Sequence, residues 1–211
     1  MGNDSEALQI LERLGAITNN DHFVYTSGRH GSVYINKDAI YPHIKDIMTL
    51  GYLMADIICF RDVDVVLGPE KGGIILAQWV AYGLIKMTGR EDICAIYAER
   101  EGDHFVIKRG YEKLIPGRNI LIVEDILTTG GSIRKVVSAV EGLRGNIVAL
   151  TAICNRGGVK VEDVGISSGF YSLINDLNLE SWTEAECPLC ARGVSVNTTI
   201  GKGRKFLAGR H

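Results

Sequence analysis

The chain has 211 residues and a mass of 23.1 kDa, about the size of one domain. Hydrophobic residues make up 46% and charged residues 23% of the sequence, a balance typical of a globular protein that excludes disorder as the dominant state. With 23 Lys and Arg against 25 Asp and Glu, the formal net charge of −2 gives no overall basic field for nucleic acids or anionic membranes, so any anion must bind at a local site.

The N-terminal part predicts a helix, a hairpin and a second helix. Apolar residues at helical spacing predict the first helix over Ser5–Leu14. His22–Tyr25 and Ser32–Asn36 have the composition of two short strands, and the glycine-containing residues 26–31 between them suit a turn. Helical periodicity returns over Ile44–Phe60. We therefore expect a small N-terminal hood in front of a larger core.

From Val63 onward, short apolar runs alternate with helical patterns. The predicted strands are Val63–Leu67, Ile93–Tyr97, Ile120–Val123, Ile147–Cys154 and Phe170–Ile174, and the predicted helices are Ile74–Met87 and Ser132–Leu143. Strands that are apolar throughout and alternate with helices indicate an α/β fold with a parallel sheet flanked by helices on both faces. We expect one domain over residues 1–211, with about 1–43 forming the hood and about 44–211 the core and C-terminal segment. Ligands of such sheets bind outside the carboxyl ends of the strands.

The strongest chemical signal follows the strand Ile120–Val123. Two adjacent acids come first, and a Thr/Gly-rich turn then opens a helix, so that backbone N–H groups, hydroxyls and the helix dipole converge on one point. That point suits a phosphate, and the acids suit the hydroxyls of a sugar attached to it. The pattern is not a P-loop, because no Gly-Lys-Ser/Thr follows. The candidate sugar-phosphate residues are Glu124, Asp125, Ile126, Leu127, Thr128, Thr129, Gly130, Gly131 and Ser132.

A second glycine-rich turn, 68–73, ends the predicted strand Val63–Leu67 and precedes a helix. Its position suits a second anion. Lys71 is the charged residue of this turn, and taken alone it would more often be a solvated surface lysine.

Together these two turns resemble the type I phosphoribosyltransferases, whose signature is an apolar strand, two acids and a Thr/Gly-rich loop. The resemblance implies a sheet of that family's type, with a small hood. It also implies that the loop at Thr128–Ser132 holds the 5′-phosphate of phosphoribosyl pyrophosphate. The loop with Lys71 would hold the pyrophosphate, often with a cis peptide that does not involve proline. Mg²⁺ would be carried by the diphosphate and not fixed by the protein. A plain strand–turn–helix is the alternative.

The hood resembles that of the orotate enzymes within this family. Thr26-Ser27-Gly28-Arg29 matches their turn, although many of them have Lys at the position of Thr26. By this resemblance Tyr34 and Ile35 cover the pyrimidine, while Thr128 and Arg156 also contact the base. The guanidinium of an arginine suits a planar anionic base, because it forms paired hydrogen bonds. The alternatives are that Tyr34 and Ile35 only pack the hairpin and that Arg156 is an exposed loop residue.

Residues 98–110 correspond to the flexible loop that closes over the pyrophosphate in the orotate enzymes. Arg100 and His104 are retained here as catalytic candidates beside Glu124 and Asp125, and Lys108 and Arg109 are further candidate anion contacts, each with a solvated surface charge as its alternative. The segment departs from the family in its acids, which are Glu99, Glu101 and Asp103. Two glycines and few apolar anchors predict a mobile lid.

The resemblance implies transfer of the phosphoribosyl group to orotate, giving orotidine 5′-monophosphate and pyrophosphate in pyrimidine biosynthesis. It also implies a homodimer in which each lid reaches the neighbour's site. One alternative is a related enzyme for a purine or uracil. Another is a non-catalytic regulator that senses phosphoribosyl pyrophosphate. The absence of a basic stripe argues against the nucleic-acid surface that such regulators usually carry, so we expect no nucleic-acid partner.

The remaining features concern location and the cysteines. No apolar run approaches the ~20 residues that cross a bilayer, and the N-terminal residues lack the features of a signal peptide, so the cytoplasm is expected, without membrane association. Five cysteines do not indicate a disulfide framework. Cys187 and Cys190 form one CxxC pair, which supplies two ligands where a closed zinc site needs four. A structural or incidental role is favoured, and a metal shared across a dimer is the lesser alternative.

Overall fold

The fold is taken from a computed structural model that describes residues 3–25, 27–175 and 180–209. The chain divides into two compact units, of which the larger comprises residues 1–8 and 41–176 and the smaller residues 9–40 and 177–211. Helix α1 (Asn3–Arg13) crosses the boundary between them. The C-terminal segment thus groups with the N-terminal residues, which the sequence patterns did not indicate. No helix of the described residues is long and apolar enough to cross a membrane.

The larger unit is built on a six-stranded sheet of order β10-β9-β8-β5-β6-β7. Its strands are β5 (Val65–Pro69), β6 (Cys94–Glu101), β7 (His104–Val106), β8 (Asn119–Leu127), β9 (Asn146–Asn155) and β10 (Gly169–Ile174). All neighbours are parallel except β6 and β7, which form an antiparallel hairpin. The predicted α/β fold with a parallel sheet is confirmed. Since β9, β8 and β5 are adjacent and parallel, their carboxyl ends meet at one edge of the sheet.

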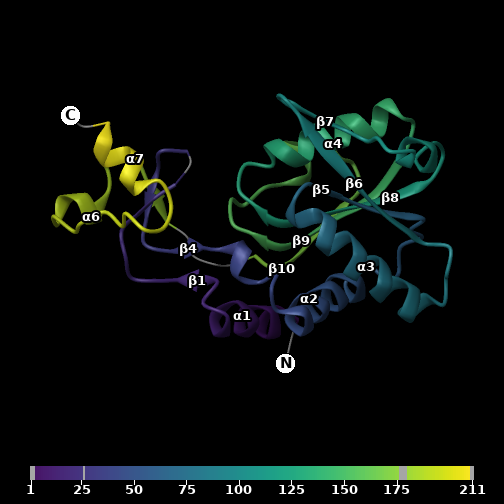
Figure 1. Cartoon of the computed structure of the whole chain (residues 1–211), viewed down its shortest axis with the longest axis horizontal. Helices are drawn as coiled ribbons and strands as arrows, with labels where there is room; N and C mark the ends of the chain where they lie inside the picture. Colours follow the sequence, from purple (N-terminus) through teal and green to yellow (C-terminus); the bar gives the residue numbers. More distant parts are fainter. Residues whose placement is uncertain (1–2, 26, 176–179, 210–211) are drawn as a thin grey trace. The chain divides into compact units, whose positions relative to one another are not determined.

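Helices cover both faces of this sheet (Figure 1). The helices of the unit are α2 (Ile44–Asp56), α3 (Gly72–Thr88), α4 (Gly131–Gly142) and the short α5 (Val161–Val164), and η2 (Tyr111–Leu114) is a 3₁₀ turn. Helix α3 packs on β5 and β6, and α2 packs on α3. Helix α4 lies on the opposite face, where Ile133 and Val136 join a fully buried cluster with Ile122. Successive strand residues point to opposite faces of the sheet. Because helices cover both faces, β8 is apolar on both sides.

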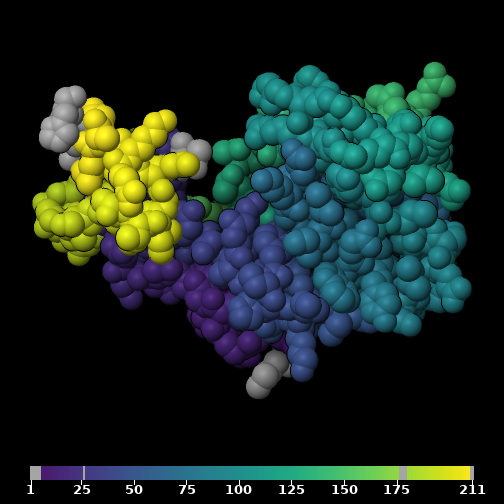
Figure 2. All heavy atoms as spheres, in the orientation of Figure 1, coloured from purple at the N-terminus to yellow at the C-terminus, as the bar shows by residue number. Residues whose placement is uncertain are grey.

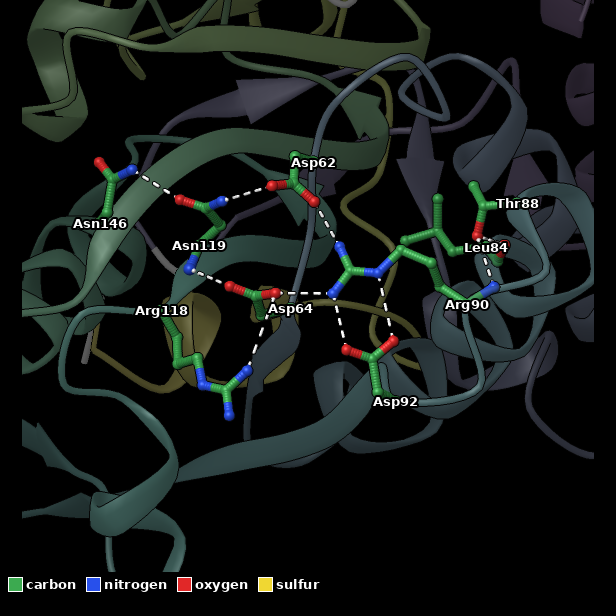
Figure 3. A network of polar contacts seen from close by, with 9 residues as sticks. All are labelled: Asp62, Asp64, Leu84, Thr88, Arg90, Asp92, Arg118, Asn119 and Asn146. Carbon is green, nitrogen blue, oxygen red and sulfur yellow. Dashed lines mark hydrogen bonds and ion pairs between the residues drawn. The ribbon is translucent and has the colours of Figure 1, made fainter.

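A network around Arg90 joins the amino ends of the strands, at the edge opposite the carboxyl ends (Figure 3). Its guanidinium donates to Asp64 and Asp92 at 2.8 Å each and also pairs with Asp62. The other oxygen of Asp64 accepts from the backbone N–H of Asn119 at 2.9 Å. The Arg90 hydrogen bond, followed by that of Asn119, lowers the pKa of Asp64, and Arg90 likewise lowers the pKa of Asp92. The network therefore links the starts of β5, β6 and β8.

Among its described residues, the smaller unit holds two small sheets, the end of α1 and two short helices near the C-terminus. Strand β1 (Ile17–Thr18) pairs with β4 (Tyr34–Ile35), and a second sheet has the order β11-β3-β2. The remaining elements are β2 (Phe23–Val24), β3 (His30–Gly31), η1 (Lys37–Ala39), β11 (Ser181–Trp182), α6 (Pro188–Ala191) and α7 (Gly203–Ala208). Figure 2 shows C-terminal atoms of this unit, in yellow, lying against N-terminal atoms in purple.

The predicted hairpin pairing is wrong in its second strand. The strand that pairs with Phe23–Val24 is His30–Gly31, which the prediction placed in the turn, whereas Tyr34–Ile35 pairs with β1. The turn closes earlier than expected because the backbone N–H of Tyr25 donates to the carbonyl of Arg29 at 2.8 Å. The strand therefore resumes at His30.

Candidate active site

Two helices begin at the same edge of the sheet, and the first N–H of the second one, that of Gly131, donates to Thr129 Oγ1 at 3.4 Å. Helix α3 follows β5 and helix α4 follows β8, and β5 and β8 are parallel neighbours. Neither helix has a side-chain cap or an acidic residue in its first turn. The positive ends of two helix dipoles therefore lie side by side, which suits a ligand with two separated phosphate groups.

The first of these helix starts is the turn that contains Lys71. The peptide bond between Glu70 and Lys71 is cis, which confirms the expectation from the family resemblance. The backbone at Gly72 comes close to two polar groups, because a Cβ there would lie 2.0 Å from the Tyr41 hydroxyl and 2.1 Å from Asp125 Oδ2. The turn thus sits directly against Asp125, and the exposed side chain of Lys71 is at the same helix start.

The two predicted acids lie at the end of β8 and are both buried. Successive residues of a strand point to opposite faces, so Asp125 faces the α3 side and Glu124 faces away from it. Asp125 Oδ2 accepts a hydrogen bond from the Tyr41 hydroxyl at 2.5 Å, and Oδ1 accepts from the Ile126 N–H at 2.7 Å. Glu124 Oε1 accepts from the N–H of Asp125 at 3.0 Å. Both carboxylates are therefore held in fixed orientations.

The predicted phosphate loop joins β8 to α4. Thr128, Thr129 and Ser132 are exposed, so their hydroxyls are accessible to a ligand. Gly130 has φ +71°, and a Cβ there would lie 2.7 Å from Val164, so only glycine fits without strain.

Two other predicted members of the site, Ile126 and Leu127, still belong to β8. The side chain of Leu127 is buried in the core cluster. Any contact of Leu127 with a ligand therefore falls to its backbone.

Arg156 follows β9 at the same edge and is half-buried. The loop that carries it is fixed by two hydrogen bonds of 2.9 Å between the Asn155 side chain and the backbone of Val159. The N–H of Gly157 also donates to the carbonyl of Leu127 at 3.1 Å, which ties this loop to the phosphate loop. Cys154, just before it, is fully buried, and burial raises the pKa of its thiol to about 12, so it is not a nucleophile.

The predicted lid is the hairpin of β6 and β7. It has more apolar anchoring than expected, because Phe105 and Ile107 are buried in the core cluster. Each acid that departs from the family pattern is paired: Glu99 with Arg109, Glu101 with Lys108, and Asp103 with Lys135 of α4.

The Lys135 contact lowers the pKa of Asp103 and attaches the hairpin to the phosphate-loop helix. Within the described part of the chain, Arg100 and His104 form no ion pair, and Arg100 lies over the Phe105 ring at 5.9 Å. Lys108 and Arg109 are therefore paired with acids of the hairpin. Arg100 and His104 are not, so their side chains can contact an anion.

The predicted base-covering residues belong to the smaller unit. Ile35 is buried there, and the ring of Tyr34 packs against Phe23 with 5.5 Å between the centroids. Both side chains thus contribute to the packing of their own unit. Thr26, part of the turn that resembles the orotate enzymes, lies outside the described residues.

Sequence reasoning missed Tyr41, which contacts Asp125 through its hydroxyl. It lies between the hood and the first core helix and belongs to no motif. A tyrosine in a connecting segment carries no sequence signal for such a role.

The family model and the related proteins that match this chain agree on one family. The model of the phosphoribosyl transferase domain matches residues 38–182. An orotate phosphoribosyltransferase of Thermoanaerobacter sp. (strain X514) is 36% identical over 189 residues, covering 90% of this chain and 93% of that protein. One from Thermotoga maritima is 33% identical over 199 residues, covering 93% and 98%.

Solved structures share the fold. Orotate phosphoribosyltransferase of Mycobacterium tuberculosis superposes with a TM-score of 0.66 at 21% identity, covering 82% of this chain and 96% of that one. Adenine phosphoribosyltransferase of Saccharomyces cerevisiae superposes with a TM-score of 0.56 at 18% identity, covering 81% and 99%. At these identities the structures establish the architecture, which enzymes for different bases share.

Proposed function

The chain belongs to the phosphoribosyl transferase domain family, and from that membership we propose that it is an orotate phosphoribosyltransferase of pyrimidine biosynthesis. It transfers the phosphoribosyl group of phosphoribosyl pyrophosphate to orotate and releases pyrophosphate. The observation that carries this proposal is the pair of uncapped helix starts beside two buried carboxylates. The choice of orotate rests on relatives of that name, which match nearly the whole chain.

Each part of phosphoribosyl pyrophosphate has a matching group. The N–H groups at the start of α4, with the hydroxyls of Thr128, Thr129 and Ser132, bind the 5′-phosphate. The start of α3 and Lys71 bind the pyrophosphate. The carboxylates between them accept hydrogen bonds from the ribose hydroxyls.

The reaction needs negative charge near the sugar and positive charge near the leaving group. As the bond from C1 to the pyrophosphate oxygen breaks, the ring becomes positively charged. A ring nitrogen of orotate then bonds to C1, and its N–H proton passes to the departing pyrophosphate or to water. Asp125 and Glu124 stabilise the ring charge, because they are fixed carboxylates in a buried site. Lys71, Arg100 and His104 stabilise the leaving pyrophosphate. Where the hairpin that carries Arg100 and His104 covers the bound substrate, it excludes water from the reactive sugar.

Mg²⁺ fits this site, because the donors that the protein offers are carboxylate and hydroxyl oxygens, which are ligands of hard cations. When bound to the diphosphate, Mg²⁺ neutralises charge on the leaving group. The protein does not hold the ion by itself in this proposal. Asp125 and Glu124 contribute charge next to it.

Orotate binding completes the site. Arg156 and the backbone at Thr128 contact the orotate ring, with Arg156 pairing with its carboxylate or carbonyl oxygens. The enzyme acts in the cytoplasm as a homodimer in which each lid serves the partner's site.

The test is the loss of orotate absorbance on mixing the protein with phosphoribosyl pyrophosphate, with and without Mg²⁺. We expect loss of orotate only with the metal. Parallel assays with uracil, hypoxanthine and adenine should show no turnover. Turnover of one of those bases in place of orotate would refute the base assignment, and binding without any turnover would favour a sensor.

Equilibrium sedimentation that shows only monomer would refute the dimer.

A further inference from the structure

Four metal-ligating side chains meet in the smaller unit, apart from the proposed active site. They are His22, His30, Cys187 and Cys190, and one ligand atom from each lies within 4.8 Å of all the others. His22 and His30 stand at the two sides of the β2–β3 hairpin, and the cysteines stand at the start of α6. His22 and His30 lie more than a hundred positions earlier in the chain. They supply the two further ligands that the CxxC pair needs for a closed site.

The distances between these atoms match the edges of a tetrahedron around one ion. The Sγ of Cys187 lies 3.6 Å from His22 Nε2, and the Sγ of Cys190 lies 3.7 Å from His22 Nε2 and 3.4 Å from His30 Nδ1. Zinc bonds of ~2.3 Å to sulfur and ~2.05 Å to nitrogen place tetrahedral ligands ~3.6 Å apart. The two nitrogens are 2.8 Å apart, and a separation of ~3.3 Å around the ion needs only a small shift of the rings.

Contacts around the cluster orient the ligands. His22 Nδ1 lies 2.7 Å from the carbonyl of Val194, so this nitrogen carries the hydrogen and Nε2 presents its lone pair to the cluster. The N–H of Cys190 donates to the Sγ of Cys187 at 3.5 Å and fixes that sulfur. The His30 ring is held edge-on against Phe206, with centroids 4.8 Å apart.

Burial favours a closed site. His22, His30 and Cys187 are each 1% exposed or less, and Cys190 is half-buried. With four protein ligands around one point, no position is left for a substrate, which is the pattern of structural sites and not of catalytic ones. A set of two sulfurs and two imidazoles selects Zn²⁺ over the hard cations.

We infer that this cluster binds one Zn²⁺ ion, which joins the N-terminal hairpin to the C-terminal segment of the same chain. Binding replaces the two thiol protons, so Zn²⁺ enters as two protons leave. A unit this small buries little apolar surface, and a metal compensates for the limited core. The ion therefore stabilises the smaller unit, whereas the Mg²⁺ of the proposed function is carried by the diphosphate.

A metal-free arrangement is the competing explanation. In it, His30 Nδ1 donates a hydrogen bond to His22 Nε2, and the cysteines are thiols or form a disulfide. The two explanations differ in metal content, in cobalt spectra and in the oxidation state of the cysteines.

The experiment is elemental analysis of the full-length protein, purified under reducing conditions without an affinity tag that binds metal. We expect about one zinc per chain. Cys190→Ser should reduce this to near zero and lower the melting temperature, while Cys94→Ser, a control in the larger unit, should retain the zinc. If Cys190→Ser does not fold, wild-type protein stripped by a chelator is titrated with Co²⁺, and the expected result is one equivalent bound with the absorption bands of tetrahedral thiolate ligation.

Wild-type protein that holds no zinc and takes up no Co²⁺ when reduced would overturn the inference. So would zinc retained by both Cys190→Ser and His22→Ala. Mass spectrometry that finds a Cys187–Cys190 disulfide in the freshly purified protein would support the metal-free arrangement. Because metal content is measured without substrate, failure of this inference leaves the proposed transferase reaction untouched.

Discussion

Replacing Asp125 by Asn tests the proposed site at the carboxylate with the most defined surroundings. The change removes one negative charge without changing shape. Oδ1 can still accept from the Ile126 N–H, and the Tyr41 hydroxyl can rotate to accept from the new amide. We therefore expect the melting temperature to change little.

The effect on turnover should be large. A carboxylate ~4 Å from a developing positive charge contributes ~4 kcal/mol at an effective dielectric constant of ~20, which corresponds to a loss of about 10³-fold in kcat. The assay is orotate consumption at saturating substrate and Mg²⁺, together with thermal unfolding of the same preparation.

Tyr41→Phe is the matched control, because it keeps the charge of Asp125 and removes only the hydrogen bond to it. We expect a smaller loss than for Asp125→Asn, at most about 10- to 150-fold, since a hydrogen bond to a charged group contributes ~1.5–3 kcal/mol and Asp125 retains its other partner. A folded Asp125→Asn enzyme with a kcat within about threefold of wild type would refute the assignment of this carboxylate to the sugar.

Two further predictions concern the phosphate loop and the Arg90 network. Gly130→Ala should destabilise the fold by ~1–3 kcal/mol, because the residue has φ +71°, and should weaken binding of phosphoribosyl pyrophosphate. Gly142→Ala in the same helix has open space and should be neutral or stabilising, so equal melting temperatures for the two variants would contradict this account. The lowered pKa values of Asp64 and Asp92 contribute stability that is complete above their ordinary value of 3.8 and is lost as the pH falls through the folded-state values. Arg90→Met should therefore flatten the acid side of a stability–pH profile measured by urea unfolding, and an unchanged profile would show that Arg90 does not cause the shifts.

The sequence alone determined the parallel sheet and the position of one part of the candidate site. The strand Ile120–Val123, the acids after it and the turn at Thr128–Ser132 are consecutive, so local pattern and turn chemistry placed them correctly at the end of a strand. The turn with Lys71 was predicted for the same reason. Such features lie within about ten residues of one another and depend on rules of spacing that a sequence displays.

Only the tertiary structure decided the contacts between distant segments. Tyr41 contacts Asp125 beside Gly72, whose missing side chain leaves room for both groups, and no local pattern specifies that approach. The pairing of the hairpin was predicted wrongly. A difference of one residue in the length of a turn depends on its hydrogen bonds, which the composition does not reveal. His22 and Cys190 lie close together because residues from both ends of the chain fold into one unit, and long-range pairing of this kind depends on packing that is invisible in a single sequence.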